Sequence, residues 1–185
     1  MKIKVTHRFN APLEKVQEAR EKRFENLDKF PEMKQYREFW REQKGNVLKT
    51  KRRIELSAHI PPALRGVLKP EMLRCVDDSE YDFDSGVHVW TVIPEHHRDV
   101  FFCKGKSVYR ERIKQDGTPE TVRDLEMVIK VKVPVVGKIA EQVLGKAYEK
   151  NLEKDCQTIK KMLGIMENDG KPSTSNGDEE SLDEE

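Results

Sequence analysis

Apolar and polar residues alternate along several stretches of the chain, which is the spacing typical of half-buried β-strands. The clearest alternation places Leu125, Met127 and Ile129 on one face, with charged residues between them. A turn signal at 115–118 precedes this run and predicts a hairpin. The predicted strands span residues 3–9, 47–58, 72–83, 86–93, 99–113 and 124–133. We therefore expect a sheet of about six or seven antiparallel strands.

Other segments have helical spacing. Asn10 and Pro12 predict the start of a short helix directly after the first strand. Residues 23–44 also carry apolar residues at helical intervals, interrupted at Pro31, and we expect two short helices or a helix and a loop there. Residues 63–68 are expected to form one amphipathic turn.

The last helical segment, residues 138–166, is the longest. Its apolar residues recur at steps of three and four, which places them along one face. They are Ala140, Leu144, Tyr148, Leu152, Cys156, Ile159 and Leu163. An antiparallel sheet with one apolar face must cover that face, and a long helix with an apolar stripe does so. The sequence therefore predicts an α+β fold in which a curved antiparallel sheet wraps around the C-terminal helix.

Composition divides the chain into a body and a tail. Residues 167–185 contain eight acids and one lysine, a net charge of −7, so the other 166 residues carry +8 within the total of +1. The tail has little apolar surface to bury and is expected to be disordered. We expect one domain over residues 1–166 in a cytoplasmic protein, because no apolar run reaches the ~20 residues that span a bilayer.

This order of elements resembles the START-like superfamily, also called SRPBCC or helix-grip, over about residues 2–165. Residues 60–66, a short proline-started helix, and the acidic stretch 76–81 are similar to the middle of PRELI-type lipid-transfer domains. Residues 131–138 are similar to uncharacterised bacterial members. The resemblance implies that a lipid, sterol or other apolar molecule binds between sheet and helix. It implies no cofactor, and no catalytic residue is carried over from it.

The inward faces of the strands and of the terminal helix supply the candidate ligand-binding residues. These are Phe101, Leu125, Met127, Ile129, Leu144, Tyr148 and Leu152. Each fits an ordinary core equally well. His88 and Trp90 share one face of a strand and are further candidates, because an inward His88 could bind a ligand headgroup. The alternative that we favour has both residues on the outer face, packed against neighbouring side chains.

The partners that we expect are an apolar small molecule and, transiently, an anionic membrane surface. Leu64, Val67 and Leu68 are the predicted portal through which a lipid enters. The basic stretch 49–53 favours peripheral membrane docking, at ~1 kcal/mol per charge near the surface. It lacks interleaved aromatic residues for base stacking, which argues against nucleic-acid binding.

Two other functions fit the same layout. A cyclase-like or hydrolase-like enzyme would need an acid or base inside the cavity, for which the candidates are His88, Glu126 and Tyr109. A protein-interaction module would have its helix packed so tightly that no cavity exists. A filled interior would favour the module.

The histidines and cysteines of the chain do not predict a metal site or a catalytic nucleophile. His96 and His97 are adjacent on a charged turn, which we interpret as a solvated hairpin loop and not as a metal site. Cys75, Cys103 and Cys156 are odd in number and far apart. We expect three reduced and mostly buried thiols, with no disulfide and no catalytic nucleophile.

Overall fold

An antiparallel sheet and two α-helices dominate the part of the chain that the computed structural model describes, which comprises residues 1–22, 33–56, 62, 65–66 and 69–169. The elements are β1 (Lys2–Phe9), α1 (Leu13–Lys22), β2 (Met33–Lys44), β3 (Val47–Leu56), η4 (Pro70–Leu73, a 3-10 helix), β4 (Arg74–Asp82), β5 (Val87–Pro94), β6 (Phe101–Ile113), β7 (Pro119–Val131) and α2 (Gly137–Asp169).

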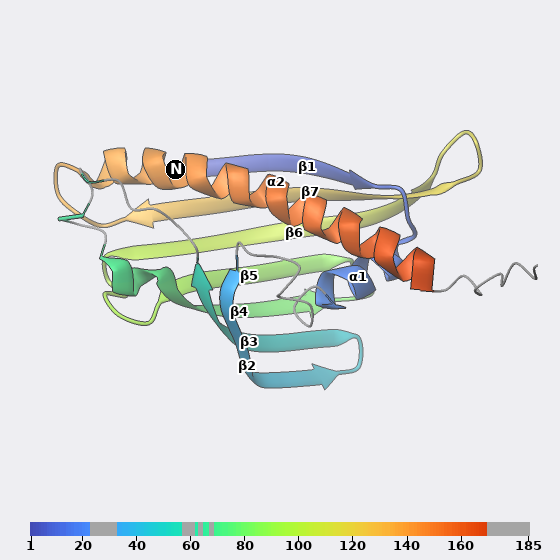
Figure 1. Cartoon of the computed structure of the whole chain (residues 1–185), viewed down its shortest axis with the longest axis horizontal. Helices are drawn as coiled ribbons and strands as arrows, with labels where there is room; N and C mark the ends of the chain where they lie inside the picture. Colours follow the sequence, from blue (N-terminus) through green and yellow to red (C-terminus); the bar gives the residue numbers. More distant parts are fainter. Residues whose placement is uncertain (23–32, 57–61, 63–64, 67–68, 170–185) are drawn as a thin grey trace, which may run out of the picture.

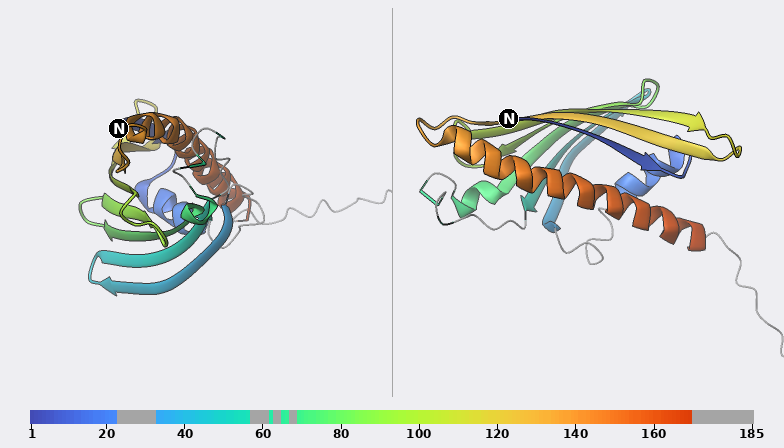
Figure 2. Two further views of the ribbon diagram at one scale, coloured as in Figure 1. Left: turned by 90° about the vertical axis from the view of Figure 1, so that its left-hand side faces the viewer. Right: turned by 90° about the horizontal axis from the view of Figure 1, so that it is seen from above.

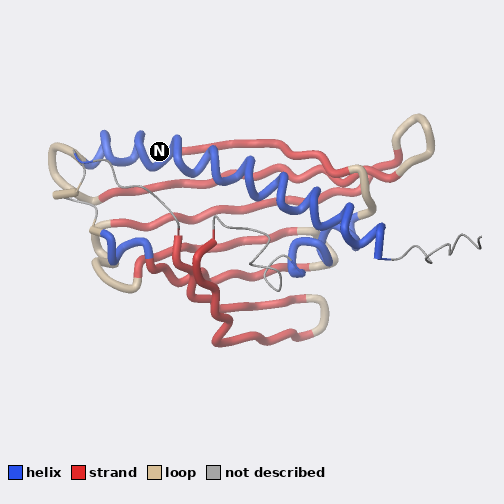
Figure 3. Tube along the Cα trace, viewed as in Figure 1, coloured by secondary structure: helices blue, strands red, loops and turns tan. Residues whose placement is uncertain are grey.

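The strands form one seven-stranded sheet in the order β1-β7-β6-β5-β4-β3-β2 (Figures 1 and 3). From β2 to β7 each strand pairs with its neighbour in the sequence, and β1 returns to pair with β7. The sheet curves around α2, which crosses its concave side, and α1 lies on the same side near the C-terminal end of α2 (Figure 2). This arrangement is a helix-grip fold, so the predicted fold class is confirmed.

Two clusters of buried side chains fill the concave side of the sheet. The first lies under the N-terminal half of α2 and includes Ile3, Val92, Phe101, Cys103, Leu125, Met127, Ile129, Val131 and Ala140. The second lies under α1 and the C-terminal half of α2 and includes Phe9, Val16, Ala19, Leu48, Tyr81, Tyr109, Cys156, Ile159 and Met162. Because each large apolar side chain stabilises the fold by roughly 1.5–3 kcal/mol when fully buried, these clusters hold α1 and α2 on the sheet.

The helical structure predicted across residues 23–44 is wrong for its second part, which forms strand β2. This strand pairs with β3 at the edge of the sheet, and its register shifts between Glu38 and Trp40. Such a shift inserts an extra residue and interrupts the strict alternation of faces, so the apolar residues of this strand imitate helical intervals. Residues 23–32 lie outside the described part of the chain.

The other predicted strands correspond to β1 and β3 to β7, and the predicted terminal helix corresponds to α2. These predictions are confirmed, with boundaries that differ by a few residues. The portal residues Leu64, Val67 and Leu68 lie outside the described residues, as does the segment 170–185. The portal and the disordered tail therefore stay predictions.

Candidate functional site

The middle of the concave face is an apolar surface shared by the sheet and α2. The side chains that β6 and β7 bury there include Phe101, Leu125, Met127 and Ile129. Those of α2 that pack against them are Leu144, Tyr148 and Leu152, and these three remain partly exposed. The residues that the sequence singles out on the strands and on the helix are thus brought together, on surfaces that face each other.

Strand β5 turns His88 and Trp90 toward this apolar surface. Trp90 pairs with Gly105 on β6, and a Cβ atom at position 105 would collide with the Trp90 ring. Glycine therefore leaves the space in which the ring lies. The His88 ring stacks on Trp90, with centroids 5.1 Å apart and planes 21° apart. The placement of His88 and Trp90 on the outer face, favoured above, is wrong. The alternation pattern could not distinguish the inner face from the outer one, because both faces of this strand carry apolar residues.

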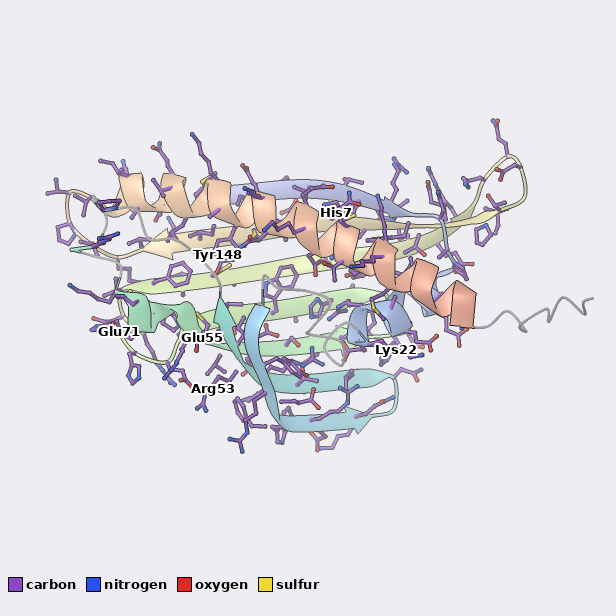
Figure 4. All side chains as sticks on the ribbon, viewed as in Figure 1. His7, Lys22, Arg53, Glu55, Glu71 and Tyr148 are labelled. Atoms are coloured by element: carbon purple, nitrogen blue, oxygen red, sulfur yellow. The ribbon has the colours of Figure 1, made fainter. Side chains whose placement is uncertain are left out.

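A buried polar atom, the hydroxyl oxygen of Tyr148, has no hydrogen-bond partner among the described residues. The Tyr148 side chain lies between α2 and the sheet (Figure 4), with its ring centroid 6.5 Å from that of Phe101. Burial raises the pKa of Tyr148 well above its ordinary value. Burial also raises the pKa of Cys75 and of Cys103 to about 12. Both thiols are therefore protonated at neutral pH, which makes them poor nucleophiles.

Beyond Trp90 the concave side becomes polar, where α1 approaches β4 and β5. The Nη2 atom of Arg20 lies 3.0 Å from Nε2 of His88. Since arginine only donates hydrogen bonds, His88 accepts through Nε2 in this contact. The Arg20 guanidinium also lies 5.2 Å from the centroid of the Tyr81 ring, and the side-chain amide of Gln17 donates to the Tyr81 hydroxyl at 2.6 Å.

A second polar group lies under the C-terminal half of α2. Arg123 of β7 donates to Oδ2 of Asp155 on α2 at 2.8 Å and to Nδ1 of His7 on β1 at 2.7 Å. Burial lowers the pKa of His7, and the charge of Arg123 lowers it further. Burial acts to raise the pKa of Tyr109, but the charges of Arg123 and Arg20 and the hydrogen bond from Arg123 together outweigh it, so the pKa of Tyr109 is lowered. This group ties α2 to two strands.

A third polar group joins α1 to the edge of the sheet. Arg52 of β3 donates from Nη2 to Glu21 of α1 at 2.6 Å and from Nε to Glu38 of β2 at 3.1 Å. The hydroxyl of Tyr36 donates to the same Glu38 carboxylate at 3.3 Å, and burial raises the pKa of Tyr36 to about 12. Two carboxylates therefore balance the charge of Arg52.

The opposite, convex face of the sheet carries an open groove of ≈ 770 Å³. Trp40 and Val89 are its exposed apolar residues, and lysine–carboxylate pairs such as Lys49–Glu80, at 2.9 Å, border it. The basic outer face predicted for the second strand is present. Its cations, however, each face a carboxylate, which reduces the attraction that the strand exerts on an anionic surface.

The three acid or base candidates lie on different faces. Glu126 of β7 projects from the convex face, where it pairs with Lys2 at 3.1 Å, so it does not reach the apolar surface under α2. Tyr109 and His88 do face the concave side. Each of them contacts a buried arginine, Arg123 for the tyrosine and Arg20 for the histidine.

Within the described ranges, no cluster of three or more histidine, cysteine or acidic residues has an arrangement that could hold a metal ion. His96 and His97 are exposed, and the Nε2 atom of His97 lies 3.3 Å from a carboxylate oxygen of Glu71. No helix among the described residues is long and apolar enough to cross a membrane.

The sequence analysis missed three buried arginines, Arg20, Arg52 and Arg123. The pattern of apolar positions nevertheless places all three on inward faces. Arg52 lies on such a face because it alternates with Leu48 and Thr50 on its strand. Arg20 follows Val16 by four residues and therefore lies on the apolar face of its helix. Arg123 precedes Leu125 by two residues and shares its inward face. A cation at a position that the pattern assigns to the core must find a partner inside the protein.

Comparisons with known proteins agree with this geometry. The model of a family described as "Protein of unknown function (DUF2505)" matches residues 4–163. No curated protein has a significant sequence match. Three solved structures are similar. TTHA0849 from Thermus thermophilus is 13% identical, with a TM-score of 0.57 over 90% of this chain and 99% of that one. Ara h 8.0201 is 10% identical, with a TM-score of 0.56 over 89% of this chain and 98% of that one. The Zhui aromatase/cyclase from Streptomyces sp. R1128 is 13% identical, with a TM-score of 0.59 over 94% of this chain and 98% of that one. At these identities the likeness shows the fold alone.

Proposed function

The chain belongs to DUF2505, a family of proteins of unknown function, and we propose that it binds an apolar ligand, a lipid, on the concave side of the sheet beneath α2. The observation that carries the proposal is the incomplete cover of apolar side chains on the concave side. Trp90, Leu144, Tyr148 and Leu152 pack against the core but stay partly exposed. A protein-interaction module with a tightly packed helix would bury them completely, so their exposure favours space for a ligand.

The shape and chemistry of this surface favour a long apolar molecule. The partly covered residues run along α2 from Leu144 to Leu152 and meet Trp90 on the sheet. Covering such a surface with hydrocarbon gains roughly 25 cal/mol for each Å² removed from water. Polar groups at the end near α1 suit a ligand that has one polar end and one apolar chain, as lipids have.

The two tryptophans of the chain provide a test of this site, because Trp90 packs against the concave apolar core and also borders the convex groove, whereas Trp40 is exposed in that groove. Trp40→Phe leaves Trp90 as the sole tryptophan, and Trp90→Phe leaves Trp40. The probe is a dibrominated octadecanol, an uncharged lipid whose bromine atoms quench indole fluorescence at short range. We expect saturable quenching in the Trp40→Phe variant and none in the Trp90→Phe variant.

Either of two results would contradict the proposal. Absence of quenching in both variants up to the solubility limit of the probe would show that no apolar ligand binds. Quenching in the Trp90→Phe variant, which retains only Trp40, would move the binding site to the convex groove, whether or not the Trp40→Phe variant is quenched as well. Native mass spectrometry of the protein purified from its own cells then identifies the bound molecule and tests whether it is a lipid.

Transfer of the ligand between membranes is a further part of the proposal. The predicted portal is amphipathic, and replacing Leu64, Val67 and Leu68 together with serine removes its apolar side. We expect this triple variant to bind the dibrominated octadecanol in solution as the parent does, but to collect it more slowly from phosphatidylcholine vesicles. If the triple variant takes up the probe from vesicles as fast as the parent, the protein still binds the ligand, but these three residues do not form its portal.

A further inference from the structure

Three arginines are buried on the concave side, and they differ in how their charge is balanced. Arg123, 3% exposed, has the Asp155 carboxylate at 2.8 Å. Arg52, 2% exposed, has Glu21 at 2.6 Å and a second carboxylate at 3.1 Å. Arg20 is 7% exposed, and its nearest carboxylate oxygen among the described residues, that of Glu21, lies 4.0 Å away. Burying a guanidinium without a close counter-ion destabilises the folded protein unless a bound anion balances its charge.

The hydrogen bonding of Arg20 is incomplete as well. A guanidinium carries five N–H donors, and the only acceptor that Arg20 has among the described residues is Nε2 of His88. The face of the Tyr81 ring attracts the cation at 5.2 Å but satisfies none of the remaining donors. The other N–H groups of Arg20 have no acceptor in the described part of the chain, and because none of its nitrogen atoms is both fully enclosed and unpaired, an acceptor from outside the protein can reach them.

These donors lie beside the apolar surface. His88, which accepts from Arg20, stacks directly on Trp90. Ser107, which is buried, lies opposite His88 on β6 and shares its face. Opposed residues of an antiparallel pair have Cβ atoms about 5 Å apart, so the Ser107 side chain lies close to that of His88, the residue that accepts from Arg20. A ligand chain lying on Trp90 would end within reach of Arg20 and Ser107.

We propose that Arg20 binds the acidic headgroup of the ligand, a carboxylate or a phosphate, while the apolar chain of the ligand lies over Trp90 toward α2. This inference rests on the proposed function and specifies its ligand class. An acidic headgroup accepts two parallel hydrogen bonds from a guanidinium and supplies a closer counter-charge than that of Glu21, which lies 4.0 Å from Arg20. The Ser107 hydroxyl donates a third. The contact with Tyr81 holds the guanidinium in place before the ligand arrives.

The test measures how well three lipids with the same chain displace the dibrominated octadecanol from the Trp40→Phe protein. They are oleate, oleoyl lysophosphatidate and oleyl alcohol, and they share the same hydrocarbon chain while their polar ends differ. We expect one or both acids to displace the probe at about tenfold lower concentration than the alcohol, the gain typical of a charge-assisted hydrogen bond. The acid that shows this preference identifies the headgroup as carboxylate or phosphate.

Variants at one position then assign the preference. Arg20→Gln should remove the advantage of the acids and leave displacement by oleyl alcohol unchanged, whereas Arg20→Lys should retain part of it. Lys15→Gln is the matched control, because it removes one exposed positive charge from the same helix and should change nothing.

The outcomes separate the inference from the function on which it rests. Equal displacement by all three lipids in the unmodified site, or an acid preference that survives in Arg20→Gln, would overturn the role of Arg20 while the apolar site stands. Absence of quenching by the probe, which leaves no signal for a displacement measurement, would overturn the proposed function itself.

Discussion

Lys51, Arg52 and Arg53 are consecutive cations on β3, yet they have different surroundings. Lys51 and Arg53 project from the convex face and pair with carboxylates while remaining 44% and 49% exposed. Arg52 points to the concave side and is held there by Glu21 and Glu38. Exposed pairs keep most of their hydration and contribute little to stability, whereas a buried cation depends on its partners. The face of the sheet, and not the residue type, decides which charges matter for the fold.

The same contrast holds for apolar residues and for ligand binding. On β7, Ile129 is fully buried under α2, while its neighbour Val128 borders the convex groove. Of the two tryptophans, Trp90 packs against the core of the concave side although it also borders the convex groove, whereas Trp40 is exposed on the convex side. The concave side thus combines buried charges with partly covered apolar groups, which is why we place the ligand there. Matched substitutions on the two faces test this division.

The largest effect is expected from Ile129→Ala. Removing three buried carbon atoms from a site with no exposure lowers the free energy of unfolding by about 4 kcal/mol, through lost burial and the cavity left behind. Val128→Ala on the convex face should cost about 1 kcal/mol or less, because its environment is already solvated. Urea denaturation measures both. Similar losses for the two variants would mean that the convex face is also covered, for example by self-association.

A smaller effect is expected from Asp155→Asn, which removes the carboxylate that faces Arg123. We expect a loss of about 2 kcal/mol, less than for a fully buried pair because the Asp155 side chain is 27% exposed. Asp78→Asn removes the partner of Lys51 on the convex face and should cost less than about 1 kcal/mol. Raising the salt concentration should abolish the second effect and not the first. If salt reduces the stability losses of both variants equally, the ion pair on the concave side is no better shielded from solvent than the one on the convex face.

Gly105→Ala should have a moderate effect, since the added Cβ atom collides with the Trp90 ring. We expect a loss of about 1–2 kcal/mol, as in other overpacked cores, together with a shift in the emission of Trp90. Gly164→Ala on α2 is the control, because its Cβ atom would meet open space and helix propensity then favours alanine. An unchanged Trp90 emission in Gly105→Ala would show that the ring does not rest on this glycine.

Strand β7 was predictable from the sequence because its two faces differ in polarity at nearly every position. The apolar residues Leu125, Met127 and Ile129 alternate with mostly charged ones, so both the strand and its inward face follow. Strand β2 was not predictable, because its register shifts break the alternation, whereas the other edge strand, β1, has an unbroken register with β7 and was predicted. Local pattern specifies an element only where burial on one face is uninterrupted.

The candidate site was predictable in part, for a related reason. Leu144, Tyr148 and Leu152 lie on the stripe of a long helix, and a stripe of that length can cover only the apolar face of the sheet. The inward turn of His88 and Trp90 was not predictable, because β5 has apolar residues on both faces and only its register with β6 distinguishes them. The partners of the buried arginines come from distant segments, which no local pattern encodes.

The smallest effect concerns pH and His7, whose pKa is lowered by burial and by the charge of Arg123. As the pH falls below the ordinary histidine value of 6.5, the unfolded chain takes up a proton at this position while folded His7 stays neutral. The folded state therefore loses stability from pH 6.5 down to the lowered pKa, and nothing changes above 6.5. His7→Gln removes this proton uptake, so the stability difference between wild type and variant should narrow as the pH falls from 7.5 to 5. Urea denaturation across that range measures the difference. A constant difference would mean that His7 is protonated as easily in the folded protein as in the unfolded chain, so that the concave side does not exclude the added charge.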